Sequence, residues 1–197
     1  MKMNIKTYII NGEGFTQLSD DAKNNLSDGL LKQIAILRWG YDENKSDNRI
    51  NNLIDDLSGL KSFYTFVTKG DRQINTPIIG TAYFCQDENN EKHWYYGDLV
   101  VHRRYKRLGI FRRLAIHRHW RTGRLMVCIH PQIAEDMIDM AMRELRMRKA
   151  SKLFAYVAKD DKSSIALHKR LGFVPSENQE NINDFDKNDK IVFSYNF

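Results

Sequence analysis

The chain has 197 residues and a formal net charge of +6, with 42% hydrophobic and 28% charged residues. This length suits one domain with a substantial core, and the composition excludes a mostly disordered chain, a collagen-like fibre and a coiled coil. The longest apolar runs cover a few residues, far below the ~20 that a membrane helix needs. No secretory signal is visible, and two cysteines are too few for a disulfide framework or a four-ligand zinc site. We therefore expect a single soluble domain over residues 1–197, located in the cytoplasm and without a metal.

Apolar periodicity predicts the elements of the first half of the chain. Residues 5–10 have the β-branched content of an opening strand, which the turn-forming segment Asn11–Gly14 ends. Helices are expected from Ser19 and over Ile50–Leu57, because leucine and isoleucine recur there at helical spacing. The strands of an antiparallel meander follow, over residues 63–68, 78–85 and 93–101.

The second half of the chain alternates predicted helices and strands. A helix is expected directly after Gly109 and another over residues 133–148. The remaining elements are a strand over 153–157, a helix over 163–171, and strands after Gly172 and over 191–197. This order predicts an α/β chain in which a mixed sheet is packed against helices.

The positive charge of the chain is concentrated in one segment. Residues 102–124 hold nine lysines and arginines and no carboxylate, whereas the rest of the chain has an acidic excess. A focused positive field favours an anionic, phosphate-bearing partner. The alternative is a solvated basic helix face, and charge alone does not choose between the two.

Within this segment, an apolar strand, a short basic loop and a predicted helix follow one another. The strand ends at Val101 and the loop contains one glycine, Gly109. The unpaired N–H groups and the dipole of a helix N-terminus form an anion site, and a glycine lets phosphate oxygens approach the backbone. The loop lacks the Gly-Lys-Ser/Thr of a Walker loop and the spaced glycines of a dinucleotide fingerprint.

A second motif follows in the segment from Asp161 to Phe173, which joins a capped helix to a glycine stop and a new strand. Together the two segments resemble motifs of the GNAT superfamily, the acyl-CoA-dependent N-acyltransferases. That family carries an apolar strand followed by Arg/Gln-x-x-Gly-x-Gly/Ala, and later an Asn-x-x-Ala-x-x-Leu-Tyr-x-x-x-Gly-Phe helix. The matching residues here are 106–111 and 161–173, and the resemblance covers residues 93–175, about half of the chain.

The resemblance implies a fold, a co-substrate and a set of binding residues. The fold is a GNAT-type mixed, mostly antiparallel sheet with helices on both faces, whose fourth and fifth strands, here 93–101 and 153–157, splay apart. The co-substrate is acetyl-CoA. The residues that would bind it are Leu99, Val100 and Val101 along the pantetheine arm, Lys106, Arg107, Leu108, Gly109, Ile110, Phe111 and Arg112 around the diphosphate, and Asp161 and Ser164 between them.

The sequence departs from the family pattern at three places. Phe111 stands where a small residue is usual, so its ring must point away from the phosphates or change how they sit. His168 stands where the family has a tyrosine that often protonates the departing thiolate, and an imidazole can also donate a proton. His168 is therefore the candidate catalytic acid, with a packing histidine as the alternative. The interval between the motifs is longer than usual, and the extra segment, about 117–135, would lie beside the cleft or in a homodimer contact.

No general base is identified from the sequence. Family members often carry a glutamate at positions that are Gly97 and Tyr95 here, and strand alternation places Asp98 on the opposite face. The amine would then lose its proton through a water held by backbone carbonyls or by His93. Cys128 lies in an apolar run without a His/Asp partner pattern, which disfavours a covalent intermediate and favours direct attack by the amine.

The predicted activity is transfer of an acetyl group from acetyl-CoA to a primary amine of a protein, a small molecule or an aminoacyl group. The resemblance implies that residues 26–60, the N-terminal helices and the loop between them, set the specificity for the acceptor. The carboxylates of this stretch attract a cationic amine or form a solvated face. These carboxylates are Asp42, Glu43, Asp47, Asp55 and Asp56. The alternative function is nucleic-acid binding through residues 102–124, on the same fold without catalysis.

Overall fold

The computed structural model describes residues 5–40, 46–58, 61–70, 76–102, 105, 115–118, 125–128, 133–176 and 189–197. Its strands are β1 (Ile5–Asn11), β2 (Ser62–Lys69), β3 (Ile78–Gln86), β4 (His93–Val101), β5 (Ala115–Arg118), β6 (Leu125–Cys128), β7 (Lys152–Ala158), β8 (Val174–Pro175) and β9 (Lys190–Asn196). Its helices are α1 (Gly12–Thr16), α2 (Asp20–Leu26), the π-helix η1 (Ser27–Leu31), α3 (Lys32–Trp39), α4 (Ser46–Ser58), α6 (Ile133–Met147) and α7 (Lys162–Arg170).

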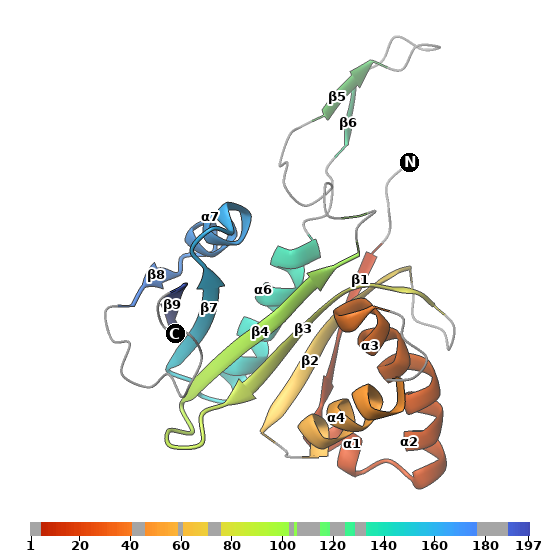
Figure 1. Ribbon diagram of the computed structural model, residues 1–197. Helices are drawn as coiled ribbons and strands as arrows, with labels where there is room; N and C mark the ends of the chain where they lie inside the picture. The colour runs from red at the N-terminus through yellow and green to blue at the C-terminus, as the bar shows by residue number, and fades with distance from the viewer. Residues whose placement is uncertain are drawn as a thin grey trace.

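The main sheet has seven strands in the order β1-β2-β3-β4-β7-β9-β8, as Figure 1 shows. Its neighbouring strands are antiparallel except β4 and β7, which run parallel. The predicted mixed, mostly antiparallel sheet is therefore confirmed. A parallel pair needs a long crossover, and here the chain between β4 and β7 includes β5, β6 and α6.

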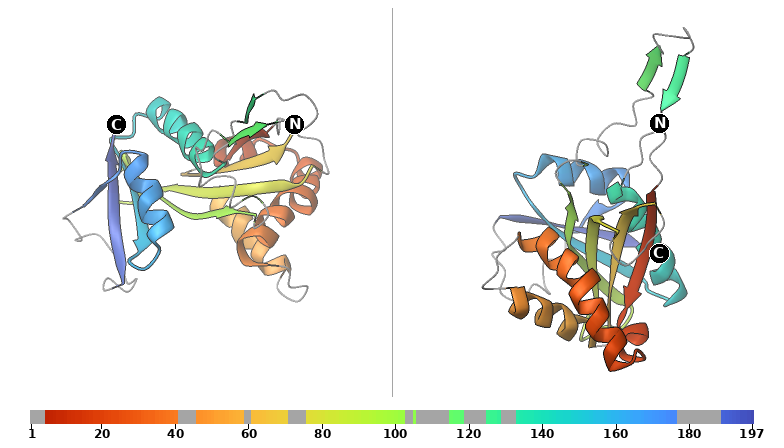
Figure 2. Two further views of the ribbon diagram at one scale, coloured as in Figure 1. Left: turned by 90° about the horizontal axis from the view of Figure 1, so that it is seen from above. Right: turned by 90° about the vertical axis from the view of Figure 1, so that its right-hand side faces the viewer.

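Helices cover both faces of this sheet, as the predicted fold requires (Figure 2). On one face, α6 packs against β1 to β4 around a core in which Phe63 and Phe84 stack with ring centroids 4.7 Å apart. On the other face, the N-terminal helices pack against β2 and β3 around Tyr64 and Phe66. Among the described residues, no helix combines the length and the apolar content that crossing a membrane requires.

One local prediction is wrong. The expected turn at Asn11–Gly14 is the start of α1, because the Asn11 side chain accepts a hydrogen bond from the Gly14 N–H at 2.8 Å and caps the helix. Farther along the chain, residues 115–118 form β5 and pair with β6, and the start of the helix expected directly after Gly109 lies outside the described residues. These two short runs satisfy each other's backbone groups, and Gly123 between them is a typical turn residue. Residues 106–114 lie outside the described part of the chain.

The helix α6 packs closely over Gly80 of β3. A Cβ atom added at Gly80 would lie 2.9 Å from Cγ2 of Ile133 and 3.1 Å from Cε of Met137. We therefore expect Gly80→Val to lower the free energy of unfolding by about 2 kcal/mol, because the added methyl groups overpack the core. The control is Gly97→Val on the neighbouring strand, where an added Cβ meets nothing within 4 Å. Equal urea midpoints for the two variants would contradict the close packing.

Candidate active site

The parallel strands β4 and β7 separate partway along their length. Their pairing runs from His93 opposite Lys152 to Tyr96 opposite Ala155, and it ends there. Both strands continue, β4 to Val101 and β7 to Ala158, without pairing with each other. The predicted splay of these strands is therefore confirmed, and within the described part of the chain it leaves one edge of β4 without a partner strand along its last residues.

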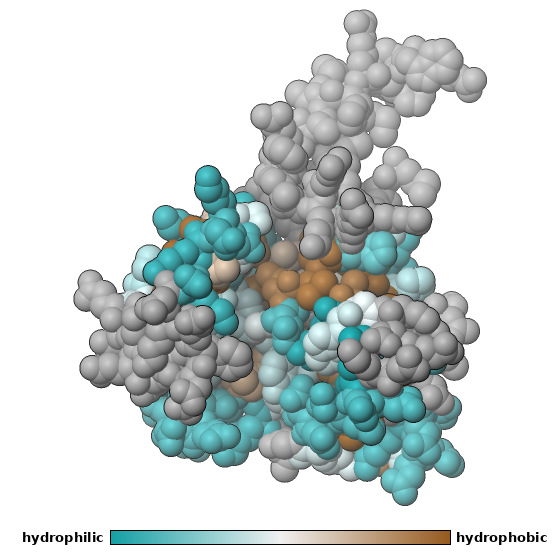
Figure 3. All heavy atoms as spheres, in the orientation of Figure 1, coloured by the Kyte–Doolittle hydropathy of each residue, from teal (hydrophilic) through white to brown (hydrophobic). Residues whose placement is uncertain are grey.

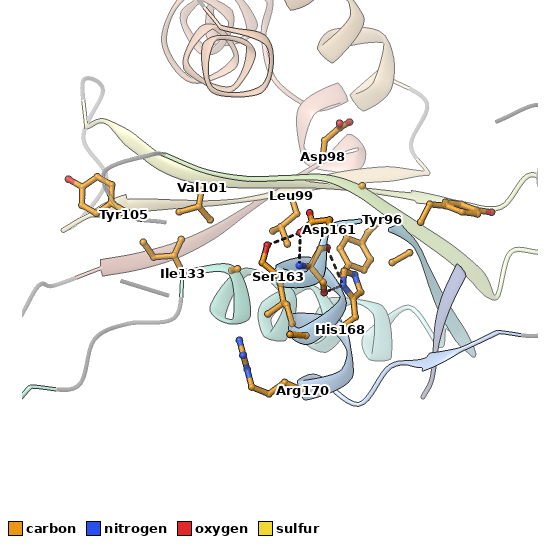
Figure 4. A pocket seen from close by; sticks show the side chains of 17 residues that line it. Tyr96, Asp98, Leu99, Val101, Tyr105, Ile133, Asp161, Ser163, His168 and Arg170 are labelled. Carbon is orange, nitrogen blue, oxygen red and sulfur yellow. Dashed lines mark hydrogen bonds between the residues drawn. The ribbon is translucent and has the colours of Figure 1, made fainter. Parts of the chain in front are cut away.

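A β-bulge lies where β4 leaves β7. In the ladder with β3, Tyr83 faces Gly97 and Thr81 faces Val100, so Asp98 and Leu99 together oppose one residue. Asp98 has a φ of 50°, in the left-handed region. Figure 4 shows the result, because the Asp98 side chain points toward the N-terminal helices whereas Leu99 points to the side of His168. The expectation from strand alternation was wrong here, since the bulge reverses the side to which Asp98 points.

Arg38 of α3 ties the bulge to the rest of the protein. Its side chain is 8% exposed, and its Nη2 donates a hydrogen bond to Asp98. Its Nη1 donates to the hydroxyl of Tyr64 at 2.8 Å, and that hydroxyl donates to Asp56 at 2.6 Å. The guanidinium also lies 4.2 Å from the ring centroid of Trp39. These five residues, which we call the Arg38 network, connect α3, α4, β2 and β4, and the sequence did not predict them.

A cavity of about 460 Å³ lies in the opening between β4 and β7, a size typical of small-molecule sites. Residues of β4, α6 and β7 contribute to its wall, and α7 closes it from the side (Figure 4). The apolar part of the wall includes Leu99, Val101 and Ile133. In Figure 3, hydrophobic residues gather at the corresponding place on the surface.

The cavity brings together several of the residues predicted to bind acetyl-CoA. Leu99, Val101, Asp161 and Ser164 line it, whereas Val100 does not. The predicted diphosphate loop, residues 106–112, lies outside the described residues, as does most of the basic segment 102–124. The lining residues that the sequence did not single out include Tyr96 of β4, Tyr156 of β7 and Tyr105, which immediately precedes that loop.

Asp161 has a clear local role as the N-cap of α7. Its carboxylate accepts a hydrogen bond from the Ser164 N–H at 2.9 Å and another from the Ser163 hydroxyl at 2.7 Å. The hydrogen bond from the backbone of Ser164, followed by the one from Ser163, holds the pKa of Asp161 below its usual range. The carboxylate is therefore ionised at neutral pH and orients the first turn of α7 at the wall of the cavity.

His168 lies at the inner end of the cavity and is 2% exposed. Its Nδ1 donates to the carbonyl oxygen of Ser164 at 2.6 Å, and its Nε2 therefore accepts the hydrogen bond of the Tyr96 hydroxyl. Burial lowers the pKa of His168, so the ring is neutral at pH 7. Burial also raises the pKa of Tyr96, which keeps its proton. In this arrangement, the proton between the two side chains belongs to Tyr96.

The lowered pKa of His168 predicts a pH dependence of stability. In the unfolded chain this histidine takes up a proton near its ordinary pKa of about 6.5, whereas the folded protein resists protonation until a lower pH. The stability contribution is complete above pH 6.5 and is lost as the pH falls toward the folded-state value. We expect the free energy of unfolding to decrease from pH 7 to pH 5, and to decrease less steeply in His168→Phe. Parallel slopes in urea titrations of both proteins would contradict this.

Several solved structures with a similar fold are described as acetyltransferases. A candidate acetyltransferase from Acinetobacter baylyi has a TM-score of 0.60 and 11% identity, covering 100% of this chain and 95% of its own. A candidate GNAT-family acetyltransferase from Desulfovibrio desulfuricans has a TM-score of 0.58 and 12% identity, covering 98% and 99%. The PaiA N-acetyltransferase from Thermoplasma acidophilum, solved with coenzyme A, has a TM-score of 0.53 and 11% identity, covering 99% and 100%.

Comparison at the level of sequence gives no such match. No family model matches the chain, and a search of curated proteins finds no similar sequence. At 11–12% identity, the structural likeness establishes the arrangement of the backbone, and any activity has to be argued from the residues of the site. The predicted architecture is thereby confirmed: this chain has the fold of the GNAT acetyltransferases.

Proposed function

We propose that the protein is an N-acetyltransferase of the GNAT superfamily, which transfers an acetyl group from acetyl-CoA to a primary amine. The observation that carries the proposal is the cavity between β4 and β7, which opens where the pairing of these strands ends. The GNAT-type fold of the whole chain supports it. Location in the cytoplasm, assembly as a homodimer and nucleic-acid binding remain predictions from the sequence.

The residues around the cavity fit a pantetheine arm. Such an arm carries amide groups joined by methylenes. The end of β4 offers peptide groups for the amides and apolar side chains for the methylenes. Among the described residues, no strand pairs with the β4 edge facing β7 beyond Tyr96, and the peptide groups of this edge are therefore the ones that we assign to the arm. Leu99, Val101 and Ile133 supply apolar contacts for the methylenes. We propose that Lys106–Arg112, which follow Tyr105 at the cavity wall, hold the diphosphate.

Acetyl-CoA would supply an acetyl thioester, whose carbonyl carbon gains the amine nitrogen as the carbon–sulfur bond breaks. The amine loses one proton and the departing sulfur gains one. Tyr96 and His168 are the pair that we assign to the second of these transfers. The Tyr96 hydroxyl carries the proton and directs it to His168 Nε2, while the hydrogen bond from His168 Nδ1 to the Ser164 carbonyl holds the imidazole in place. To protonate the sulfur, the hydroxyl turns its O–H bond from Nε2 toward the thiolate, and the phenolate that remains regains a proton from water. In this proposal Tyr96 releases the proton and His168 is a positioning residue, whereas the sequence pattern predicted His168 itself as the acid.

This assignment predicts the effect of removing either member of the pair. We expect His168→Phe and Tyr96→Phe each to lower kcat by about 100-fold, the usual contribution of general acid catalysis. The affinity for coenzyme A should change less than about threefold, because neither side chain lies in the predicted diphosphate loop. Stopped-flow detection of thiol release and calorimetric titration give the two quantities. An unchanged kcat in both variants would remove the pair from the mechanism.

Two measurements test the proposed function itself. Isothermal titration with acetyl-CoA should show binding at micromolar concentrations, and a panel of primary amines should then release free thiol from it. Absence of binding at millimolar acetyl-CoA would contradict the proposal. Binding without thiol release from any amine would leave a coenzyme A-binding fold and contradict the transferase activity.

A further inference from the structure

The face of the sheet opposite His168 is open beside the cavity. A Cβ built on Gly97 would meet no atom within 4 Å, and both Gly97 and Asp98 are exposed. Both residues also belong to the wall of the cavity. A molecule lying on this face of β4 therefore reaches the point where β4 and β7 separate, from the side of the N-terminal helices.

Half-buried tyrosines lie around this exposed part of β4. Tyr83 is the ladder partner of Gly97, and Tyr95 lies two residues along β4 on the same face. Tyr156 of β7 stacks on Tyr95, with ring centroids 5.9 Å apart and planes inclined by 9°. Tyr156 is itself part of the cavity wall. We call this surface the acceptor trough and define it by Tyr83, Tyr95, Gly97, Asp98 and Tyr156.

Carboxylates stand at both ends of the acceptor trough. At the inner end, the side chain of Asp98 is 49% exposed and that of Asp56 is 34% exposed, and Arg38 contacts both. At the outer end, Asp87 accepts a hydrogen bond from the Tyr95 hydroxyl at 2.8 Å. The guanidinium of Arg38 is buried beneath the inner pair. Asp87 is buried, at 9% exposure, and acts on the trough through the Tyr95 hydroxyl, whereas Asp98 and Asp56 are partly exposed. Three carboxylates thus border the trough against the one guanidinium of Arg38, which favours a cationic ligand.

The tyrosines of the trough are neutral rings. Burial is the main cause that raises the pKa of Tyr83, Tyr95 and Tyr156, and nearby carboxylates raise each further. Neutral phenol rings with carboxylates behind them form a favourable surface for an ammonium group. Burial, followed by the charge of Asp56, also raises the pKa of Cys85 to about 11, so this neighbouring thiol is protonated and does not compete as a nucleophile.

We infer that the acceptor trough binds the amine substrate, and that this substrate is an amine with a second positive charge. The inference rests on the proposed function, because it takes the inner end of the trough as the place of transfer. The reacting nitrogen must be neutral there, so the carboxylate and the stacked rings at the outer end serve another charge. Tyr95 lies two strand residues from Gly97, about 7 Å along β4. A five-carbon diamine has nitrogens at that separation.

The test compares 1,5-diaminopentane with n-pentylamine, which differ by one ammonium group. With saturating acetyl-CoA, we expect kcat/KM for thiol release to be about 30-fold higher for the diamine, as expected for one desolvated cation on aromatic rings. Calorimetry on the coenzyme A complex should show the same preference without turnover. Equal values for the two amines in the wild-type protein would overturn the inference.

Matched variants test whether the preference for the diamine arises in the trough. In Tyr156→Leu and in Tyr95→Leu, the ratio of the two kcat/KM values should fall to within about threefold of unity, because the cation–π surface is lost. Tyr195→Leu is the control, since this phenol packs against Phe173 on the α7 side, and it should keep the wild-type ratio. A wild-type ratio in Tyr156→Leu and Tyr95→Leu would overturn the inference.

Two further outcomes separate this inference from the proposed function. Efficient acetylation of n-pentylamine at the rate of the diamine would leave the proposed function intact and overturn the trough alone. If acetyl-CoA binds but none of the amines tested releases free thiol from it, the proposed function is contradicted, and the inference with it.

Discussion

Gly109→Glu should weaken binding of acetyl-CoA by at least about 100-fold. The loop that contains Gly109 follows directly on Tyr105, which lines the cavity between β4 and β7. A carboxylate at this position would occupy space that the motif reserves for phosphate oxygens and would repel their charge. The measurement is the dissociation constant for acetyl-CoA from isothermal titration, with circular dichroism to confirm that the variant is folded.

The control for this variant is Gly123→Glu. Gly123 lies in the same basic segment but outside the motif, between β5 and β6. The substitution Gly123→Glu makes the same change of residue and of net charge as Gly109→Glu. It therefore separates a local effect on diphosphate binding from a general weakening of the positive field. We expect Gly123→Glu to change the dissociation constant by less than about threefold. Equal losses in both variants, or full affinity in a folded Gly109→Glu protein, would contradict a diphosphate site at this loop.

Arg38→Met should lower kcat by about 100-fold while the affinity for coenzyme A changes little. Arg38 holds the bulge at Asp98, where β4 turns away from β7, and Asp98 keeps a left-handed φ of 50° that this contact stabilises. Without the guanidinium, the bulge loses its anchor and the peptide groups at the inner end of the cavity change position. A displacement of about 1 Å at a reacting centre costs of the order of 100-fold in rate.

The same substitution leaves Asp98 and Asp56 without their cation. We expect a loss of about 2 kcal/mol in the free energy of unfolding, less than for a fully buried pair because both carboxylates are partly exposed. The double variant Arg38→Met with Asp98→Asn removes part of that charge and should recover stability. Its kcat should stay low, because the anchor is still missing. Recovery of kcat together with stability would show that Arg38 acts on stability alone.

Much of the sheet was predictable from the sequence, because most of its strands have a local signal. The strand predicted over 93–101 has the observed bounds. The one predicted over 63–68 is one residue shorter than β2 at each end, and the one predicted over 78–85 is one residue shorter than β3 at its C-terminal end. In each, β-branched and aromatic residues fill a short run that turn-forming residues limit. The splay of β4 from β7 was expected from motif resemblance, since no periodicity shows where two distant strands stop pairing.

The features that depend on distant contacts were not predictable in this way. The Asp98 side chain at the bulge accepts a hydrogen bond from Arg38, which lies 60 residues earlier in the chain. Strand alternation contains no information about this contact and therefore placed Asp98 on the wrong face. The stacking of Tyr156 on Tyr95 required the parallel register of β7 against β4. The strands β5 and β6 were not expected from the sequence, because each run has only four residues, too few to show a strand period.

The central claim is that the opening between β4 and β7 binds coenzyme A, and a crystal structure with coenzyme A tests it most directly. We predict that the pantetheine arm lies along the β4 edge beside Leu99 and Val101, with the diphosphate at the backbone N–H groups of residues 107–110. A nucleotide bound elsewhere on the protein, or the ring of Phe111 filling the loop in place of the phosphates, would contradict the account.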